Sequence, residues 1–401
     1  MDFAYTEDQR ELVRLAGRIL TDRVTHDSLT ELEGRGAERF DPGLWSTLAD
    51  AGLVGIALPA DLGGGGYGTL EQCLVLEQAG RVLAPVPLLA TAVLGAWPIA
   101  AFGTSEQRER WVRPAVRGEL VLTAALAGPA GAPGVTARRT GGGWRLEGVR
   151  TGVPYATVAD LILVPAGERI FLVPAGTAGL TVTPQRTTAK EVTGLLHLDL
   201  TLPDDALLGP GADAQDGTGA EPDAQDGTGA EPGGQGMAGR LREMATLGLC
   251  AVQLGVTARA LEAAAEYTGK RHQFNRPIGS FQAVGHRLAD AHIDVEAIRL
   301  TMWQAAWLLS EEARAEAAAQ GTTADQERRA AEAVATAKFW AADGGHRVAH
   351  AVVHVHGGMG IAEEYFVHRY FLHAKQAEFT LGGATEQALR LGAMLAAPGP
   401  A

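Results

Sequence analysis

The chain is poor in cysteine and has no long uncharged apolar run. Only Cys73 and Cys250 occur among 401 residues, so neither a disulfide framework nor a cysteine-based zinc cluster can form. No stretch of about 18 uncharged apolar residues appears, so the sequence predicts no membrane span. The first residues are acidic and amphipathic, with no basic region followed by an apolar run. This start predicts no signal peptide and a cytoplasmic protein.

Positive charge is also scarce. There are 34 Lys and Arg residues against 47 Asp and Glu, a formal net charge of −13. This balance excludes a dedicated nucleic-acid binder, which would present a basic face. Part of the acidity is local, because the decapeptide DAQDGTGAEP occurs in tandem at 213–222 and 223–232. Residues 210–236 are too poor in apolar side chains to offset their ordering entropy, so they are predicted to form a disordered surface loop.

The rest of the chain alternates between helical and β sequence patterns. Residues 1–117 show the period of amphipathic helices. Residues 118–209 consist of short β-rich runs separated by Gly, Pro and Asp, which is typical of a small all-β unit. Residues 237–401 return to helical periodicity. The expected architecture is a helical domain, a β domain and a second helical domain.

Three long helical patterns occupy the C-terminal part. The first repeats apolar residues at steps of three and four from Leu241 to Leu261. The second runs from about Gln282 to Glu316. The third runs from about Gln326 to His356, and its glycine pair at Gly344-Gly345 is expected to interrupt the helix.

Histidines recur on the third pattern. His346, His350 and His354 have the spacing i, i+4, i+8, which brings imidazoles to one face of a helix. No acidic ligand is interleaved at a metalloprotease spacing, and the motif HEXXH is absent. We therefore predict packing or cofactor-facing roles for these histidines and no metal site.

The most informative segment joins the first two of these helical patterns. It runs from Arg271 to Gln282 with the sequence RHQFNRPIGSFQ. Arginine supplies a permanently charged, forked donor that suits a pyrophosphate, and the aromatic rings offer stacking surfaces. On spacing alone, an ordinary helix–helix connector with a proline stop is the favoured interpretation.

Two glycine-containing segments follow. In HVHGGMG, at 354–360, the glycine pair lets backbone N–H groups approach a phosphate without a Cβ in the way. The other is GGATEQALR at 382–390.

Together these segments resemble the acyl-CoA dehydrogenase family. The connector is similar to the family signature R-x-Q-F-G-R-P-I-x-x-F-Q, with Asn275 where glycine is usual. Weaker similarity covers the N-terminal runs LWSTLADAGLVGIALPADLGGGGYG and EQAGRVLAPVPLLAT. The resemblance implies an α+β multidomain fold with an N-terminal helical domain, a middle β-barrel-like domain and a C-terminal four-helix bundle.

The resemblance also implies residues that contact FAD, part of them across a subunit boundary. Arg271 would hold the pyrophosphate of the FAD in a neighbouring chain. The other implied contacts are Phe274, Ile278, Phe281, Gln282, Thr385 and Gln387 at the adenosine end, and His354, Gly357 and Gly358 near the phosphates. His354 stands where the family usually has glutamine.

The reaction of the family removes two hydrogens from an acyl thioester to give the 2,3-enoyl thioester. A glutamate takes the proton beside the carbonyl while the flavin accepts hydride. The two family positions for this glutamate hold Gly383 and Ala245 here, and neither residue takes a proton. Glu243 is close in sequence to Ala245, but two residues along a helix turn the side chain by about 200°. Glu191 is a more distant candidate, so the catalytic residue stays unassigned.

Two more segments depart from the family. Its Thr-Glu-Pro-Gly-x-Gly-Ser-Asp run corresponds to Thr123–Pro129, which lacks the Ser-Asp pair, and its Trp-Ile-Thr strand is replaced around Thr151–Tyr155. In the family these segments contact the flavin ring and the substrate. The residues for the phosphates and the adenosine are kept, and those for the flavin ring and the acyl chain have changed.

Three hypotheses follow. The chain is a subunit of a heteromer, such as α2β2 with a related subunit, as in family members that resemble enzymes of steroid side-chain degradation. Alternatively, it is a self-sufficient homotetramer with a displaced base such as Glu243, or a non-catalytic binding protein. The resemblance implies an acyl-CoA or acyl-carrier thioester as substrate. It implies an electron-transfer flavoprotein as acceptor, with oxygen as the alternative.

Overall fold

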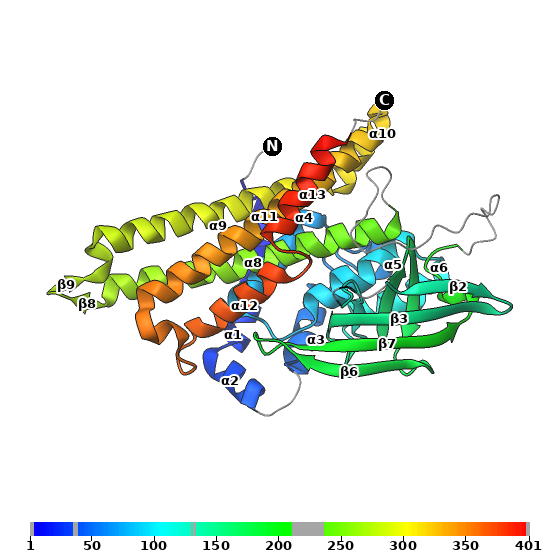
Figure 1. Cartoon of the computed structure of the whole chain (residues 1–401), viewed down its shortest axis with the longest axis horizontal. Helices are drawn as coiled ribbons and strands as arrows, with labels where there is room; N and C mark the ends of the chain where they lie inside the picture. Colours follow the sequence, from blue (N-terminus) through cyan, green and yellow to red (C-terminus); the bar gives the residue numbers. More distant parts are fainter. Residues whose placement is uncertain (1–3, 35–38, 130, 132–133, 211–235, 398–401) are drawn as a thin grey trace. The chain divides into compact units, whose positions relative to one another are not determined.

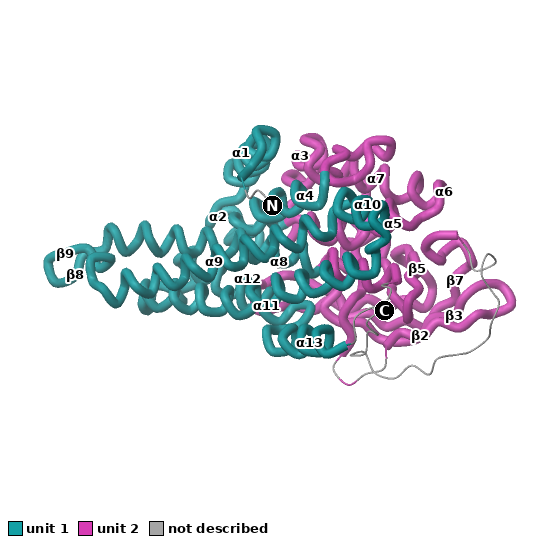
Figure 2. Tube along the Cα trace, turned by 90° about the horizontal axis from the view of Figure 1, so that it is seen from above, with its two compact units in different colours: residues 1–37, 68–85, 246–401 teal, residues 38–67, 86–245 magenta. Residues whose placement is uncertain are grey.

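The computed structural model describes residues 4–34, 39–129, 131, 134–210 and 236–397. The loop predicted to be disordered therefore lies, except for its two end residues, outside the described residues. The chain forms two compact units (Figure 2). The first unit comprises residues 1–37, 68–85 and 246–401, and the second comprises residues 38–67 and 86–245. The domain boundaries expected from the sequence stay a prediction.

The first 117 residues are helical, as their periodicity predicts. Their helices are α1 (Glu7–Arg23), α2 (His26–Gly34), α3 (Pro42–Asp50), α4 (Thr69–Val82), α5 (Trp97–Phe102), α6 (Ser105–Gln107) and α7 (Arg113–Val116), with π-helical stretches at Leu89–Ala96 and Arg108–Val112. The sequence specifies several of their starts. Thr6 forms a capping box with Gln9 before α1, and the Asp41 side chain accepts hydrogen bonds from the N–H groups of Gly43 and Leu44 before α3.

The β domain consists of two sheets around one core. Its strands are β1 (Leu122–Ala124), β2 (Thr136–Thr140), β3 (Gly143–Pro154), β4 (Leu161–Ala166), β5 (Arg169–Pro174), β6 (Leu180–Arg186) and β7 (Val192–Leu202). One sheet has the order β1-β4-β5 and the other the order β2-β3-β7-β6. Between them, Trp144 and Phe171 pack edge to face with ring centroids 5.3 Å apart. The predicted middle β domain is confirmed in this two-sheet form.

The C-terminal part is helical again (Figure 1). Its helices are α8 (Met237–Lys270), α9 (Gln282–Leu308), α10 (Glu311–Gln320), α11 (Thr323–His356), α12 (Val367–Phe379) and α13 (Ala384–Ala396). The prediction that the second pattern continues to Glu316 is wrong. The Ser310 hydroxyl accepts a hydrogen bond from Ala313 N–H at 3.2 Å and caps the start of α10, so α9 stops before it.

The predicted interruption at Gly344-Gly345 is also wrong, because α11 is continuous through both residues. These glycines are buried between helices. A Cβ on Gly345 would lie 2.2 Å from the amide nitrogen of Gln253 on α8. That amide donates hydrogen bonds to Ala341 O on α11 at 3.2 Å and to Ala374 O on α12 at 3.3 Å. The glycine therefore permits close packing and does not end the helix.

Helix α4 approaches α8 in the same way. A Cβ on Gly80 would lie 2.2 Å from Val252 O, and a Cβ on Gly255 would lie 2.0 Å from Glu77 O. The two backbones are thus in direct contact at residues without side chains. Helix α8 consequently has close neighbours along most of its length.

Helix α8 is the one described helix that is long and apolar enough to cross a membrane. In its most apolar window of 18 residues, however, 83% of the residues are buried inside the protein. Helix α8 is therefore a core helix, and its apolar composition reflects packing on several sides.

We expect Gly345→Ala to lower the free energy of unfolding by about 1–3 kcal/mol, because its methyl group needs the space of the Gln253 amide. Chemical denaturation measures this change. The matched control is Gly392→Ala on α13, where nothing lies within 4 Å of the added Cβ. The control should raise stability by about 0.5–1 kcal/mol. A destabilisation of similar size in both variants would contradict the packing role of Gly345.

Candidate cofactor site

The connector between α8 and α9 folds as a small hairpin at the end of the first unit. Its strands are β8 (His272–Gln273) and β9 (Arg276–Pro277). The two turn residues, Phe274 and Asn275, have φ angles of 52° and 62°. Positive φ at both central positions is the geometry of a tight hairpin turn, and asparagine tolerates it better than most residues. This explains how Asn275 replaces the glycine of the family signature.

The hairpin presents aromatic and basic groups to the surface. Phe274 is 87% exposed, and its ring centroid lies 6.1 Å from that of Phe281 in an edge-to-face arrangement. The Arg276 guanidinium lies 4.0 Å from the centroid of the Phe281 ring. Large apolar rings this exposed mark a surface that contacts another molecule.

The second predicted segment lies at the end of α11. Gly357 has φ 64°, a left-handed conformation that favours glycine. A Cβ on Gly357 or on Gly358 would meet nothing within 4 Å, so the backbone here faces open space. The His354 side chain is exposed. The turn is therefore accessible to a ligand.

A stack of rings joins the two segments. The His356 ring is stacked on Tyr267 with centroids 4.4 Å apart and lies 5.5 Å from Tyr365. Tyr267 precedes Arg271 by one helical turn, and His356 directly precedes Gly357. The stack therefore fixes the start of the hairpin relative to the glycine turn. The sequence does not predict this stack, because no spacing rule pairs residues on separate helices.

The His356 ring is held by its backbone. Its Nδ1 donates a hydrogen bond to Val352 O at 2.7 Å. Burial lowers the pKa of His356 and outweighs the opposing effect of that hydrogen bond. The positive charge near the turn is thus supplied by arginine and lysine side chains.

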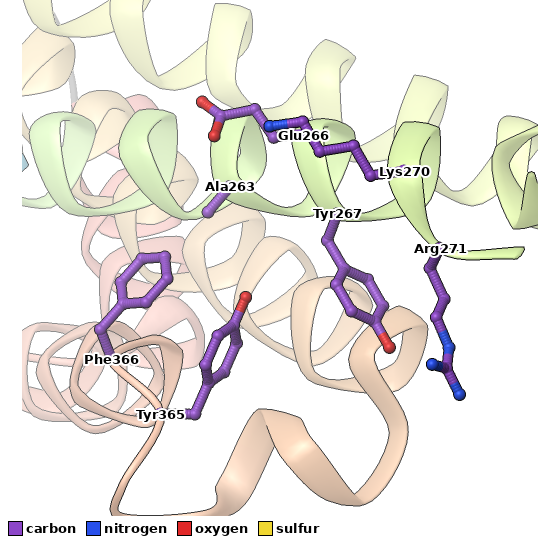
Figure 3. A pocket seen from close by; sticks show the side chains of 7 residues that line it. All are labelled: Ala263, Glu266, Tyr267, Lys270, Arg271, Tyr365 and Phe366. Atoms are coloured by element: carbon purple, nitrogen blue, oxygen red, sulfur yellow. The ribbon is translucent and has the colours of Figure 1, made fainter.

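A cavity of about 310 Å³ lies beside the stack (Figure 3). Its lining residues are Ala263, Glu266, Tyr267, Lys270, Arg271, Tyr365 and Phe366. Figure 3 shows Tyr267 and Arg271 pointing from α8 toward the segment that carries Tyr365. The structure thus brings Arg271 and the region of the glycine turn to one place.

The structure does not bring Thr385 and Gln387 to the same place as Arg271. Gln387 is buried on α13 and donates to Leu381 O at 3.1 Å, while Thr385 is exposed on the first turn. The segment before α13 is fixed near the middle of α11, where Lys338 Nζ donates to Ala377 O at 3.0 Å and to Glu378 O at 3.1 Å. Sixteen residues separate Lys338 from His354, or about 24 Å of helix. Figures 1 and 2 both show α13 well away from β8 and β9.

Comparison with known proteins identifies the family. Residues 6–119 match the N-terminal domain of acyl-CoA dehydrogenases, and residues 237–395 match their C-terminal domain. The chain is 45% identical over 400 residues to acyl-CoA dehydrogenase FadE27 of Mycobacterium tuberculosis, covering 99% of both proteins. The chain belongs to the acyl-CoA dehydrogenase family.

Solved structures agree with this assignment. A chain of the ChsE4-ChsE5 complex from Mycobacterium tuberculosis is 44% identical with a TM-score of 0.86, and the match covers 100% of both chains. A variant of the steroid ACAD Tcur3481-Tcur3483 is 39% identical with a TM-score of 0.81, covering 97% of this chain and 98% of that one. Acyl-CoA dehydrogenases are oxidoreductases that use FAD. The exposed Arg271, the open glycine turn and the cavity that Arg271 lines suit the phosphates of such a dinucleotide.

The two residues expected from the sequence at the family's glutamate positions have different surroundings. Gly383 is the residue before the first turn of α13, and Ala245 is fully buried on α8. Glu243 is also buried, at 3% exposure. Glu191 is half-buried at a turn in which Thr187 N–H donates to its carbonyl oxygen at 3.1 Å.

The spaced histidines of α11 contact α12 in this acyl-CoA dehydrogenase. The rings of His346 and His350 lie 4.3 Å apart, Lys375 Nζ lies 2.9 Å from His346 Nδ1, and Glu378 lies 3.1 Å from the same atom. No group of three or more metal-ligating side chains occurs in the part of the chain that the structure describes. These histidines therefore pack against the charged pair of Lys375 and Glu378.

The left-handed turn of the hairpin gives a direct test. We expect Asn275→Gly to keep the hairpin and Asn275→Val to destabilise it by about 1–2 kcal/mol, because a β-branched residue resists positive φ. Amide hydrogen exchange over residues 271–281 measures the effect. Exchange should be roughly tenfold faster in the valine variant and nearly unchanged in the glycine variant. Equal protection in the two variants would contradict the observed turn.

Proposed function

We propose that the chain is a subunit of a heteromeric acyl-CoA dehydrogenase that oxidises an acyl thioester to its 2,3-enoyl product. In this proposal, Arg271, Gly357 and Gly358 hold the phosphates of FAD bound in a neighbouring subunit. The observation that carries it is the separation along α11 between these residues and the terminal segment with Gln387. Two half-sites about 24 Å apart along one helix are suited to serve two different cofactors.

The chemistry of the hairpin supports the proposal. Arg271 offers a planar fork of donors to phosphate oxygens, and the glycine turn offers backbone N–H groups in open space. Phe274 and Phe281 provide faces for the adenosine end, with Ile278 and Gln282 beside them. Because Phe274 is 87% exposed in the single chain, its burial requires a second molecule.

The relatives support a related subunit as the partner. The ChsE4-ChsE5 structure is a complex of two named proteins, and the Tcur3481-Tcur3483 protein is described as a steroid ACAD. We propose an α2β2 assembly in the cytoplasm with a bulky lipid or steroid acyl-CoA as substrate. An electron-transfer flavoprotein would reoxidise the flavin.

The residues present indicate which part of the reaction each subunit would carry out. FAD, when bound, accepts the hydride from the substrate. We propose that Gly383 and Ala245 occupy the two positions of the family base, so this chain would move no proton there. Its own residues would bind and orient the cofactor, and the partner would supply the carboxylate that takes the proton beside the carbonyl.

A self-sufficient enzyme is the second candidate. The observation in its favour is that Glu243 is a buried carboxylate on α8, two residues from Ala245. A buried carboxylate has the raised proton affinity that a base needs.

The proposed binding of FAD by Arg271, Gly357 and Gly358 is tested by the flavin content of the purified protein. We expect the chain purified alone to hold little FAD, and the chain co-expressed with its related subunit to hold FAD in stoichiometric amount. Arg271→Ala should weaken FAD binding to the complex by about 10- to 150-fold, since a charge-assisted hydrogen bond contributes about 1.5–3 kcal/mol. Visible absorbance and fluorescence titration measure both quantities.

The matched control is Arg328→Ala, which removes an exposed arginine from the start of α11. It should leave FAD binding unchanged. Full FAD occupancy together with acyl-CoA oxidation by the chain alone would refute the heteromer.

The position of the base is tested separately. We expect Glu243→Gln in the complex to keep its flavin and most of its turnover, because the partner supplies the base. Steady-state kinetics with an acyl-CoA and a dye acceptor measure this. A fall of about 10²–10⁴ in turnover with flavin retained would instead assign the base to Glu243.

A further inference from the structure

The β domain contains a cavity of about 430 Å³ that shares no residue with the candidate cofactor site. Part of its wall is β6, which Figure 1 shows at the edge of its sheet beside β7. Leu180 and Val182 line the cavity from one face of β6, because alternate residues of a strand share a face. Ile162 on β4 of the other sheet lines it as well. The volume lies within the range of about 300–1,000 Å³ that is usual for small-molecule sites.

Small side chains keep this cavity open. Ala156 and Ala159, in the loop between β3 and β4, line it together with Ala175, which follows β5. Side chains normally interdigitate and fill the space of about 10 Å between two packed sheets. Because alanine has only a methyl group, the space beside Ile162 stays unfilled. The cavity therefore results from the residue types at these positions.

The loop that lines the cavity has a fixed conformation. Tyr155 has φ 53°, which is uncommon for a residue other than glycine, and its ring packs edge to face on Phe40 with centroids 6.4 Å apart. Val158 N–H donates to Tyr155 O at 3.1 Å and closes the turn. Ala175 N–H donates to Asp160 O at 2.9 Å. A site with walls held in this way loses little conformational freedom when a ligand binds.

The lining side chains define the chemistry of the cavity. Among the described residues that line it, none has an ionisable side chain, and Thr157 is the one with a polar side chain. The Thr157 hydroxyl oxygen is buried and has no hydrogen-bond partner in the part of the chain that the structure describes. A buried hydroxyl without a partner is unfavourable, and a hydroxyl can both donate and accept. A ligand with a hydroxyl or carbonyl group would supply the missing partner.

We propose that this cavity binds an uncharged small molecule that has an apolar chain or ring system and a hydroxyl or carbonyl group bonded to Thr157. A charged ligand does not fit, because no counter-charge lines the cavity and desolvating a lone charge is costly. The volume is about three times the ~150 Å³ that accommodates one benzene molecule, so it has room for about two or three rings or a chain of similar size. The site goes beyond the proposed dehydrogenase reaction. Its lining residues all belong to the second compact unit, so it requires neither FAD nor a partner subunit.

The experiment compares 1-octanol with octanoate, which has a chain of the same length and a negative charge. Each is titrated into the full chain, and methyl NMR spectra report on Ile162, Leu180 and Val182. We expect 1-octanol to shift these three methyl resonances in a saturable way. Octanoate should bind at least about tenfold more weakly, because its charge would have to enter a cavity without a counter-charge.

Two variants test the site itself. Thr157→Val keeps the shape of the side chain and removes the hydroxyl, so it should weaken 1-octanol binding about two- to tenfold. Ala175→Leu places a larger side chain at an exposed position of the lining and should block binding while the fold is kept. The matched control is Thr181→Val, on the opposite, exposed face of β6, which should leave binding unchanged.

Three results would overturn the proposal. The first is the absence of saturable shifts at Ile162, Leu180 and Val182, including shifts spread evenly over the protein. The second is octanoate binding as tightly as 1-octanol. The third is binding by Thr157→Val or by Ala175→Leu that equals that of the wild type. Flavin content and acyl-CoA oxidation do not enter these measurements, so the outcome is independent of the heteromer proposal.

Discussion

Direct contact between helix backbones is the constraint on which the first unit depends. Helix α4 touches α8 at Gly80 and Gly255, and α11 touches α8 at Gly345. At these points an added methyl group would overlap a carbonyl oxygen or an amide nitrogen. The Gln253 amide then ties three helices together by hydrogen bonds to two backbone carbonyls. This close packing holds the end of α8 against the end of α11, and so allows Tyr267 to stack on His356.

The sequence predicts much of this architecture, and its errors have physical causes. Apolar periodicity located the long helices and the β domain, because burial on one face leaves a regular pattern. The same periodicity could not reveal that Ser310 caps a new helix, since a cap depends on one side chain and its hydrogen bond. Gly344-Gly345 was interpreted as a break because glycine disfavours isolated helices. In the folded chain, packing of α11 against α8 outweighs that preference.

The candidate site was predicted in its parts more than in its arrangement. The segment Arg271–Gln282 and the pair Gly357-Gly358 stand out by residue type, and the structure places them near each other. Thr385 and Gln387 belong to a resembling motif as well, yet the segment before them is held at the middle of α11, away from the glycine turn. Sequence order carries no distance between segments, so only coordinates separate the two groups.

The separation along α11 has a consequence for how such proteins diversify. Substitutions at one half-site need not disturb another about 24 Å away along a rigid helix, so one half-site can lose its function while selection maintains the other. The product of a duplicated gene can thus lose the reacting groups and keep the residues that bind the cofactor, without any change of fold. Division of labour between sister subunits is then a short evolutionary step, and each sister becomes dependent on the other.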